Sequence, residues 1–259
     1  MIYIIAILIG ISLGLIGGGG SILTVPALVY VQGIEPVTAT AYSLFTVGAT
    51  ALVGSFDYAR KGLLDYKTAI IFGIPSIISV FLTRKLLIPI MPDPVFSLSG
   101  FAVKKSLFIM VLFALLMVAA SVSMIRGTKE AEVLREKKYN FPLIFLEGML
   151  VGMLTGLVGA GGGFLIIPAL VLLAGLPMKE AVGTSLLIIG AKSLIGFLGD
   201  VGHREMDWSF LGLFTLFAIA GIFIGSNLSK RIPGDKLKPA FGWFVLSMGV
   251  YIILKELIQ

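Results

Sequence analysis

Cysteine is absent from this 259-residue chain, and histidine occurs only once. Without thiols the protein can form no disulfide bond, use no thiol nucleophile and hold no Cys-ligated metal. A single histidine, His203, is too little to build a histidine-based metal site. We therefore expect neither a metal nor another cofactor.

Charge is scarce as well. Asp, Glu, Lys and Arg make up 13% of the chain, against about 25% in soluble domains. Hydrophobic residues make up 58%, and the mean hydropathy is +1.05. This composition excludes an ordinary soluble domain and predicts a multi-pass protein of the cell (plasma) membrane. The net charge of +6 comes from basic residues in short connections between apolar segments, so we expect membrane lipid, and no nucleic acid, as a partner.

The apolar runs have the length of membrane helices. Many contain roughly 20 residues, the number needed to cross about 30 Å of hydrocarbon, and none alternates with the period of a barrel strand. The sequence therefore predicts an all-α fold. The expected long helices are 36–58, 68–90, 102–125, 178–200, 207–228 and 238–257, and the expected short ones are 1–16, 21–31, 142–158 and 161–174. Pro142, Pro177, Pro233 and Pro239 are expected at helix starts and turns.

The chain contains an internal duplication. A shift of 142 residues aligns 8–66 with 150–208 without a gap. The pairs that this shift relates, here called repeat mates, include Gly10/Gly152, Pro26/Pro168, Gly33/Gly175, Ser43/Ser185, Gly54/Gly196 and Asp65/Asp207. Duplication in so apolar a chain is typical of transporters built from repeats.

Three regions follow from the duplication. Residues 1–125 form a first transmembrane repeat, 126–141 a polar and cytoplasmic linker, and 142–259 a second repeat. The N-terminus lacks a basic n-region, so residues 1–16 are expected to belong to the mature protein. Asp65 and Asp207 are expected to act as N-caps, each followed by an interfacial aromatic residue.

The distribution of basic residues favours inverted repeats. If each pair of short helices is a hairpin, re-entrant or fully crossing, both termini lie outside, and 13 basic residues lie inside against 6 outside. If each pair instead crosses once as a broken helix, the repeats are parallel and the split is almost even. The first arrangement obeys the positive-inside rule. Each repeat is then a glycine-tipped broken-helix hairpin plus three transmembrane helices.

Two glycine clusters at corresponding places are the candidate binding site. Glycine runs allow backbone N–H groups to converge on a ligand, and the starts of short helices at Ser21 and Gly163 would add their positive ends. Fixed N–H dipoles suit a small anion. The alternative is that the glycines only allow close helix packing. The candidate residues here are Gly17, Gly18, Gly19, Gly20, Ser21, Gly159, Ala160, Gly161, Gly162 and Gly163.

Polar side chains inside the expected spans complete the candidate site. Ser43, Thr46 and Ser185 offer hydroxyl groups, although such groups often bond to their own helix. Lys192 is the one basic residue deep in an expected span, and an intramembrane charge indicates function. It could balance an anion, or it could pair with Asp200. Asp57 and Asp200 are expected at the interface, and Glu147 near the start of its helix; these acids are the candidates for coupling to a proton.

The glycine clusters also carry a resemblance. The segments GLIGGGGSILTVP at 14–26, GLVGAGGGFLIIP at 156–168 and AVGTSL at 181–186 resemble the sulfite exporter TauE/SafE family of membrane permeases. The resemblance covers nearly the whole chain. It implies secondary transport, usually export, of small sulfur-containing oxyanions such as sulfite, thiosulfate or the organosulfonate sulfoacetate, with a possible coupling proton or ion. It does not give the oligomeric state.

Two alternatives to this function stay open. The solute could be another small anion, or the protein could be a membrane scaffold that transports nothing. An enzyme is not expected, because the sequence has no H-E-x-x-H or G-x-S-x-G motif and no base beside its hydroxyls.

Overall fold

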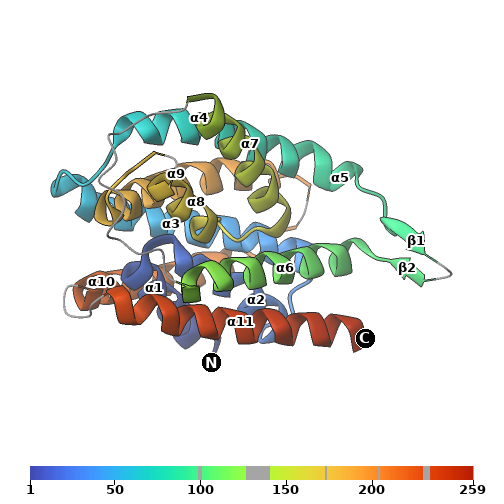
Figure 1. Cartoon of the computed structure of the whole chain (residues 1–259). Coiled ribbons are helices and arrows are strands. Elements are labelled where there is room, and N and C mark those ends of the chain that lie inside the picture. Colours follow the sequence, from blue (N-terminus) through green and yellow to red (C-terminus); the bar gives the residue numbers. More distant parts are fainter. Residues whose placement is uncertain (99–100, 127–140, 173, 204, 230–233, 259) are drawn as a thin grey trace.

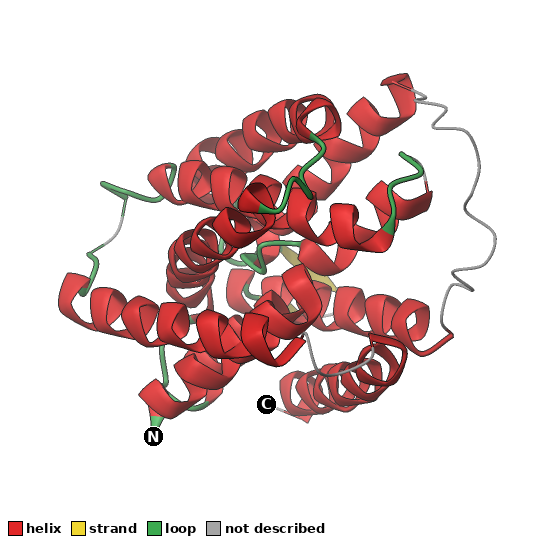
Figure 2. Ribbon diagram, turned by 90° about the vertical axis from the view of Figure 1, so that its left-hand side faces the viewer, coloured by secondary structure: helices red, strands yellow, loops and turns green. Residues whose placement is uncertain are grey.

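The structure is a computed structural model of the chain that describes residues 1–98, 101–126, 141–172, 174–203, 205–229 and 234–258. Figure 2 shows that helices dominate the described residues. The predicted linker, 126–141, falls mostly outside them. Where the two are comparable, the predicted helices agree with the observed ones to within about four residues, so the all-α architecture is confirmed.

The helices of the first repeat follow the predicted order. They are α1 (Ile2–Ile16), the 3-10 helix η1 (Gly17–Leu23), α2 (Thr24–Tyr30), α3 (Pro36–Arg60), α4 (Tyr66–Leu82), the π-helical η2 (Thr83–Leu87), α5 (Ile88–Ile90) and α6 (Lys105–Arg126). A short antiparallel hairpin, β1 (Phe96–Leu98) and β2 (Phe101–Val103), lies between α5 and α6. The sequence analysis missed this hairpin because its strands are only three residues long.

The second repeat has the same order. Its helices are α7 (Phe141–Val158), α8 (Gly163–Leu172), α9 (Met178–Leu198), α10 (Trp208–Ser229) and α11 (Gly234–Ile258). One predicted boundary is wrong: Pro239 lies inside α11. It is the sixth residue of that helix, close enough to the start that few backbone hydrogen bonds are lost.

The repeat mates Asp65 and Asp207 cap α4 and α10. Asp65 Oδ1 accepts a hydrogen bond from the N–H of Thr68 at 2.8 Å, and Asp207 Oδ1 accepts one from the N–H of Phe210 at 2.9 Å. Each bond satisfies one of the donors that the first turn of a helix leaves unpaired. The predicted N-caps are confirmed.

The apolar helices make this a multi-pass membrane protein. Within the described residues, the helices long and apolar enough to span a membrane are Pro36–Arg60, Tyr66–Ile90, Lys105–Val122, Met178–Leu198 and Trp208–Leu228. The spans in α3 and α9 are 67% buried inside the protein, against 39% for the other three. The centre of the molecule is therefore the α3/α9 pair, and these two helices are repeat mates.

The outer helices pack in pairs, and each pair contains one helix from the first repeat and one from the second. In Figure 1, α4 and α7 lie above the central pair, and α6 and α11 lie side by side below it and run in opposite directions. Helix α1 packs on α10, as its mate α7 packs on α4. Gly10 lies against the backbone of Ala218 in α10, and Gly152 lies against the backbone of Ser76 in α4. Both members of one contact are the repeat mates of the other, so α1 packs on α10 in the same way as α7 packs on α4.

The central mates run antiparallel. Positions that advance along α3 meet positions that recede along α9: Leu44 lies near Gly196, Gly48 near Leu194 and Leu52 near Gly190. A Cβ added at Gly48 would lie 3.0 Å from Leu194 Cγ, and one added at Gly190 would lie 3.0 Å from Leu52 Cβ. The glycines therefore allow the two backbones to approach closely.

One helix start differs between the repeats. The sequence predicts starts at Ser21 and Gly163, and α8 does begin at Gly163. In the first repeat, however, Gly17–Leu23 form a 3-10 helix and α2 begins only at Thr24. Ser21 is thus inside a helical connection rather than at a helix start. A run of four glycines can follow such a tight path because no side chains eclipse one another.

Candidate functional site

The two glycine clusters each contain backbone that favours glycine. Gly17 and its mate Gly159 have φ of 72° and 68°, and Gly161 and Gly162 have φ of 66° and 73°. Other residues rarely adopt these left-handed angles. Since the first cluster continues as a 3-10 helix through Gly18, Gly19 and Gly20, the second cluster is the more irregular of the two.

The clusters of the two repeats lie against each other. A Cβ added at Gly161 would lie 3.3 Å from Ser21 Cβ and 2.5 Å from Val47 Cγ1 in α3. A Cβ at Gly159 would lie 2.4 Å from Thr40 Cβ, also in α3. The structure thus brings Ser21 of the first cluster to Gly161 of the second, beside the central helix pair.

Lys192 reaches the second cluster from α9. Its fully buried ammonium group donates a hydrogen bond to Thr155 Oγ1 at 2.8 Å. The Thr155 hydroxyl in turn donates to the carbonyl oxygen of Val151 at 2.7 Å, so its oxygen can accept from Lys192. A Cβ added at Gly162 would lie 2.9 Å from Lys192 Nζ. The cation therefore lies next to the positive-φ turn.

The expected alternative for Lys192, a pair with Asp200, is wrong. Among the described residues Lys192 makes no ion pair, and its hydrogen-bond partner is Thr155. Asp200 is instead paired with another cation, Arg84, whose Nε lies 2.6 Å from Asp200 Oδ2. Asp200 is buried in the protein, and its position at the membrane interface stays a prediction.

Arg84 is the buried residue that sequence reasoning missed. Its Nη1 donates to Thr40 Oγ1 at 2.9 Å and to the carbonyl oxygen of Gly156 at 3.1 Å. Gly156 lies in the last turn of α7, so the cation complements the negative end of that helix. The available signal was a charge near the end of the apolar run 68–90. The sequence analysis did not single out this charge, because arginines at span ends commonly extend to the interface.

The predicted hydroxyl groups differ in what they contact. Ser43 Oγ is buried and has no hydrogen-bond partner among the described residues, whereas its mate Ser185 donates to the Val182 carbonyl oxygen of its own helix at 2.8 Å. Thr46 Oγ1 lies 3.0 Å from Thr215 Oγ1 of α10. Thr46 therefore bridges two helices, and the hydrogen bonds of Thr46 and Ser185 do not reach the glycine clusters.

Asp57 lies in the last turn of α3, and its position at the membrane interface stays a prediction. It forms an ion pair with Lys61, and both side chains are more than two-fifths exposed. Ser226 Oγ of α10 lies 3.4 Å from Asp57 Oδ2. Glu147 has one buried oxygen with no hydrogen-bond partner in the described part of the chain. The described residues contain no group of three or more acids and histidines that could hold a metal ion.

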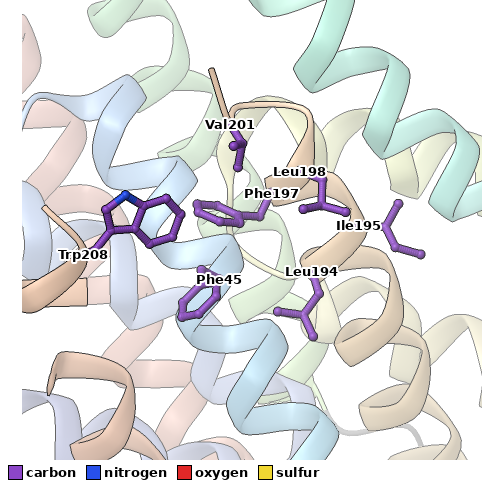
Figure 3. Close-up of a pocket in the computed structure, with 7 residues that line it drawn as sticks. All are labelled: Phe45, Leu194, Ile195, Phe197, Leu198, Val201 and Trp208. Atoms are coloured by element: carbon purple, nitrogen blue, oxygen red, sulfur yellow. The ribbon is translucent and has the colours of Figure 1, made fainter. Parts of the chain in front are cut away.

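A separate pocket opens between α3, α9 and the start of α10. Figure 3 shows its side chains gathered around one space: Phe45, Leu194, Ile195, Phe197, Leu198, Val201 and Trp208. The Phe197 ring centre lies 5.0 Å from that of Phe45 and 6.0 Å from that of Trp208. Since these seven residues are apolar or aromatic and offer an anion no buried charge, the candidate anion site lies at the glycine clusters instead.

Comparison with known proteins gives one family. The profile described as "Sulfite exporter TauE/SafE" matches residues 2–252. A "Probable membrane transporter protein" of Xylella fastidiosa strain 9a5c is 32% identical over 255 residues, which cover 96% of this chain and 92% of the relative. YunE of Bacillus subtilis strain 168 and a protein of Methanocaldococcus jannaschii, both also named probable membrane transporters, are 27% and 26% identical and cover at least 89% of each chain.

Proposed function

This chain belongs to the sulfite exporter TauE/SafE family, and on that premise we propose that it is a secondary transporter that exports a small sulfur-containing oxyanion. Sulfite and organosulfonates such as sulfoacetate are the proposed solutes. The proposed site lies between the two glycine clusters. Membrane transport follows from the family; the solute, the direction and the site are the proposal.

The observation that carries this proposal is the environment of Lys192. Its buried ammonium group has a hydroxyl partner and, within the described residues, no carboxylate. A charge buried without a counter-ion is costly. An anion bound at the second glycine cluster would lower that cost, and its release would leave the ammonium group with its hydrogen bond to the Thr155 hydroxyl. Such a site can bind an oxyanion without holding it permanently.

The backbone near Lys192 supports the same chemistry. Helix α8 begins at Gly163, directly after the positive-φ residues Gly161 and Gly162. The N–H groups of Leu165 and Ile166 in the first turn bond to the Gly162 carbonyl oxygen, and the helix dipole favours negative charge at this end of α8. The approach of Ser21 to Gly161 adds the first cluster to the same region.

The alternative role of the glycines, close packing, also has support. A Cβ at Gly159 or Gly161 would overlap residues of α3. Replacing these glycines would therefore disturb packing whether or not they bind an anion, so such variants cannot separate the two roles. Variants of Lys192 can, because an apolar side chain of similar length fills the same space without the charge.

The proposal is tested by flux through purified protein in proteoliposomes. Sulfite, sulfoacetate, thiosulfate and sulfate are supplied with a carboxylate control, with and without a pH gradient. We expect saturable flux of a sulfur oxyanion, reduced about tenfold or more in Lys192→Met, because a hydrogen bond to a charged group contributes about 1.5–3 kcal/mol. The matched control is Thr50→Val, which alters the repeat mate of Lys192. Folded protein with no flux of any sulfur oxyanion would contradict the proposed solute class, and equal flux in Lys192→Met would contradict the site.

A further inference from the structure

The two ends of the central helix pair carry polar contacts at corresponding positions. Arg84 at the end of the α4 span contacts Asp200, which follows α9. The repeat mate of Arg84 is Ser226, near the end of α10, and it contacts Asp57 near the end of α3. Asp57 is one residue out of register with Asp200 under the 142-residue shift. We call these the Arg84 contact (Arg84, Asp200) and the Asp57 contact (Asp57, Lys61, Ser226).

The contacts lie at opposite ends of the pair. Asp57 is in the last turn of α3 and Asp200 follows the last turn of α9, and these helices run antiparallel. Lys192 lies between them, eight residues before Asp200, which is about 12 Å along a helix. Each contact also joins the two repeats. The proposed anion site is thus flanked on each side by a link between the halves.

The two contacts differ in burial. The side chains of Arg84 and Asp200 are 0% and 2% exposed, and the guanidinium also donates to Thr40 and to Gly156. Asp57 and Lys61 are 42% and 43% exposed, and Ser226 Oγ of α10 lies 3.4 Å from Asp57 Oδ2. Buried pairs are hard to separate because each charge would be left uncompensated, whereas exposed pairs contribute little.

We infer that these contacts are the two gates of the transporter, and that the described conformation is closed at the Arg84 contact and loosely linked at the Asp57 contact. This inference rests on the proposed transport function. A carrier that alternates between two sides must break the links between its halves on one side at a time. The Arg84 contact fixes the end of α7, next to the glycine cluster, so its opening would also release one wall of the site. In this role Arg84 and Asp200 are positioning residues.

The natural absence of cysteine provides a direct test. A single reporter, Thr83→Cys, places a thiol next to Arg84 in the sequence. Thr83 is buried, and its Cβ would lie 2.9 Å from a Cβ added at Gly156. The rate of labelling by a maleimide is measured in membranes without any solute. We expect slow labelling in the parent and labelling about tenfold faster with Asp200→Asn or Arg84→Gln, since loss of one partner favours the open state.

Matched variants separate a gate from a general loss of stability. Asp57→Asn should leave the Thr83→Cys labelling rate within about twofold of the parent, because an exposed pair contributes little. A second reporter, Ser121→Cys, buried in α6, should label at the same rate in every background. The charge exchange Arg84→Asp with Asp200→Arg should restore slow labelling at Thr83→Cys. Arg84→Lys, a milder change, should give an intermediate rate.

Unchanged labelling of Thr83→Cys in Asp200→Asn and Arg84→Lys would overturn the inference, and so would equal acceleration at both reporters. Because this measurement needs no solute, it does not depend on the identity of the anion. A failure of the flux assay with normal labelling would contradict the proposed solute and leave the gates supported. Normal flux with unchanged labelling would contradict the gates and leave the transport proposal supported.

Discussion

Lys192 is charged, whereas its repeat mate Thr50 is polar but uncharged. The shift that relates the repeats replaces Lys192 by Thr50 and Thr155 by Leu13. The hydrogen-bonded pair beside the second glycine cluster therefore has no equivalent in the first repeat. Sequence analysis could single out Lys192 because a charge in the middle of an apolar span is conspicuous. It could not predict the partner, since Thr155 is 37 positions away and only packing brings it within hydrogen-bond distance.

Arg84 shows the limit of the same reasoning at the residue scale. A basic residue near the end of an apolar run is normally interfacial, and hydropathy alone cannot distinguish it from a buried one. Its burial depends on Asp200, 116 positions later, and on the carbonyl oxygen of Gly156. These are tertiary contacts without a local sequence signal.

Gly162 provides a residue-scale prediction. It has φ of 73°, and an added Cβ would lie 2.1 Å from Thr155 Cγ2. We expect Gly162→Ala to lower the free energy of unfolding by more than the roughly 1–2 kcal/mol that a left-handed alanine costs. Thermal unfolding of the purified protein in detergent measures this.

The control for Gly162→Ala is Gly33→Ala. Gly33 has nearly the same φ, 72°, but an added Cβ there would meet nothing within 4 Å. It should therefore show only the backbone cost. Equal shifts in the two variants would show that space beside Thr155 is not limiting.

At the scale of elements, the sequence predicted the long helices well and the connections poorly. Apolar run length and capping aspartates set where α4 and α10 begin. The 3-10 path of Gly17–Leu23 and the π-helical turn Thr83–Leu87 were missed. Both are local adjustments of backbone that neighbouring helices impose, so residue types alone do not reveal them.

The antiparallel α3/α9 pair gives an element-scale prediction. Gly48 and Gly190 are mates, and each would place an added Cβ 3.0 Å from a leucine of the other helix. We expect Gly48→Ala and Gly190→Ala each to destabilise the protein by about 1–3 kcal/mol, with similar values, because overpacking forces the helices apart. Thermal unfolding is again the measurement.

Gly212 in α10 is the matched control, because an added Cβ there would meet nothing within 4 Å. Gly212→Ala should be neutral or stabilising, since alanine favours the helix by up to about 1 kcal/mol. If Gly48→Ala and Gly190→Ala behaved like this control, the close approach of α3 and α9 would be contradicted.

At the scale of the whole molecule, the duplication could be predicted from the sequence, but the packing of helices from one repeat against helices from the other could not. The 142-residue shift relates α3 to α9, but nothing in it indicates that α1 would pack on α10 and α7 on α4. That interleaving follows from burying the two central helices on all sides. It also explains why Gly10 and Gly152, which are mates, both lie at close helix contacts.

The antiparallel direction of α3 and α9 supports inverted repeats, in agreement with the bias of basic residues. We predict that both termini lie outside the cell. Epitope tags at Met1 and Gln259 should be accessible to antibody on intact cells, with a cytoplasmic protein as the control for leakage. A tag detectable only after permeabilisation would contradict this topology.

The measurement that tests the central claim most directly is anion binding to purified protein with and without the Lys192 charge. Calorimetric titration with sulfite and with sulfoacetate should give saturable binding to the parent and to Thr50→Val. Binding to Lys192→Met should be weaker by about tenfold or more, as expected for the loss of a charged hydrogen-bond donor. Undiminished binding by folded Lys192→Met would contradict the claim that an oxyanion binds at the buried ammonium beside the second glycine cluster.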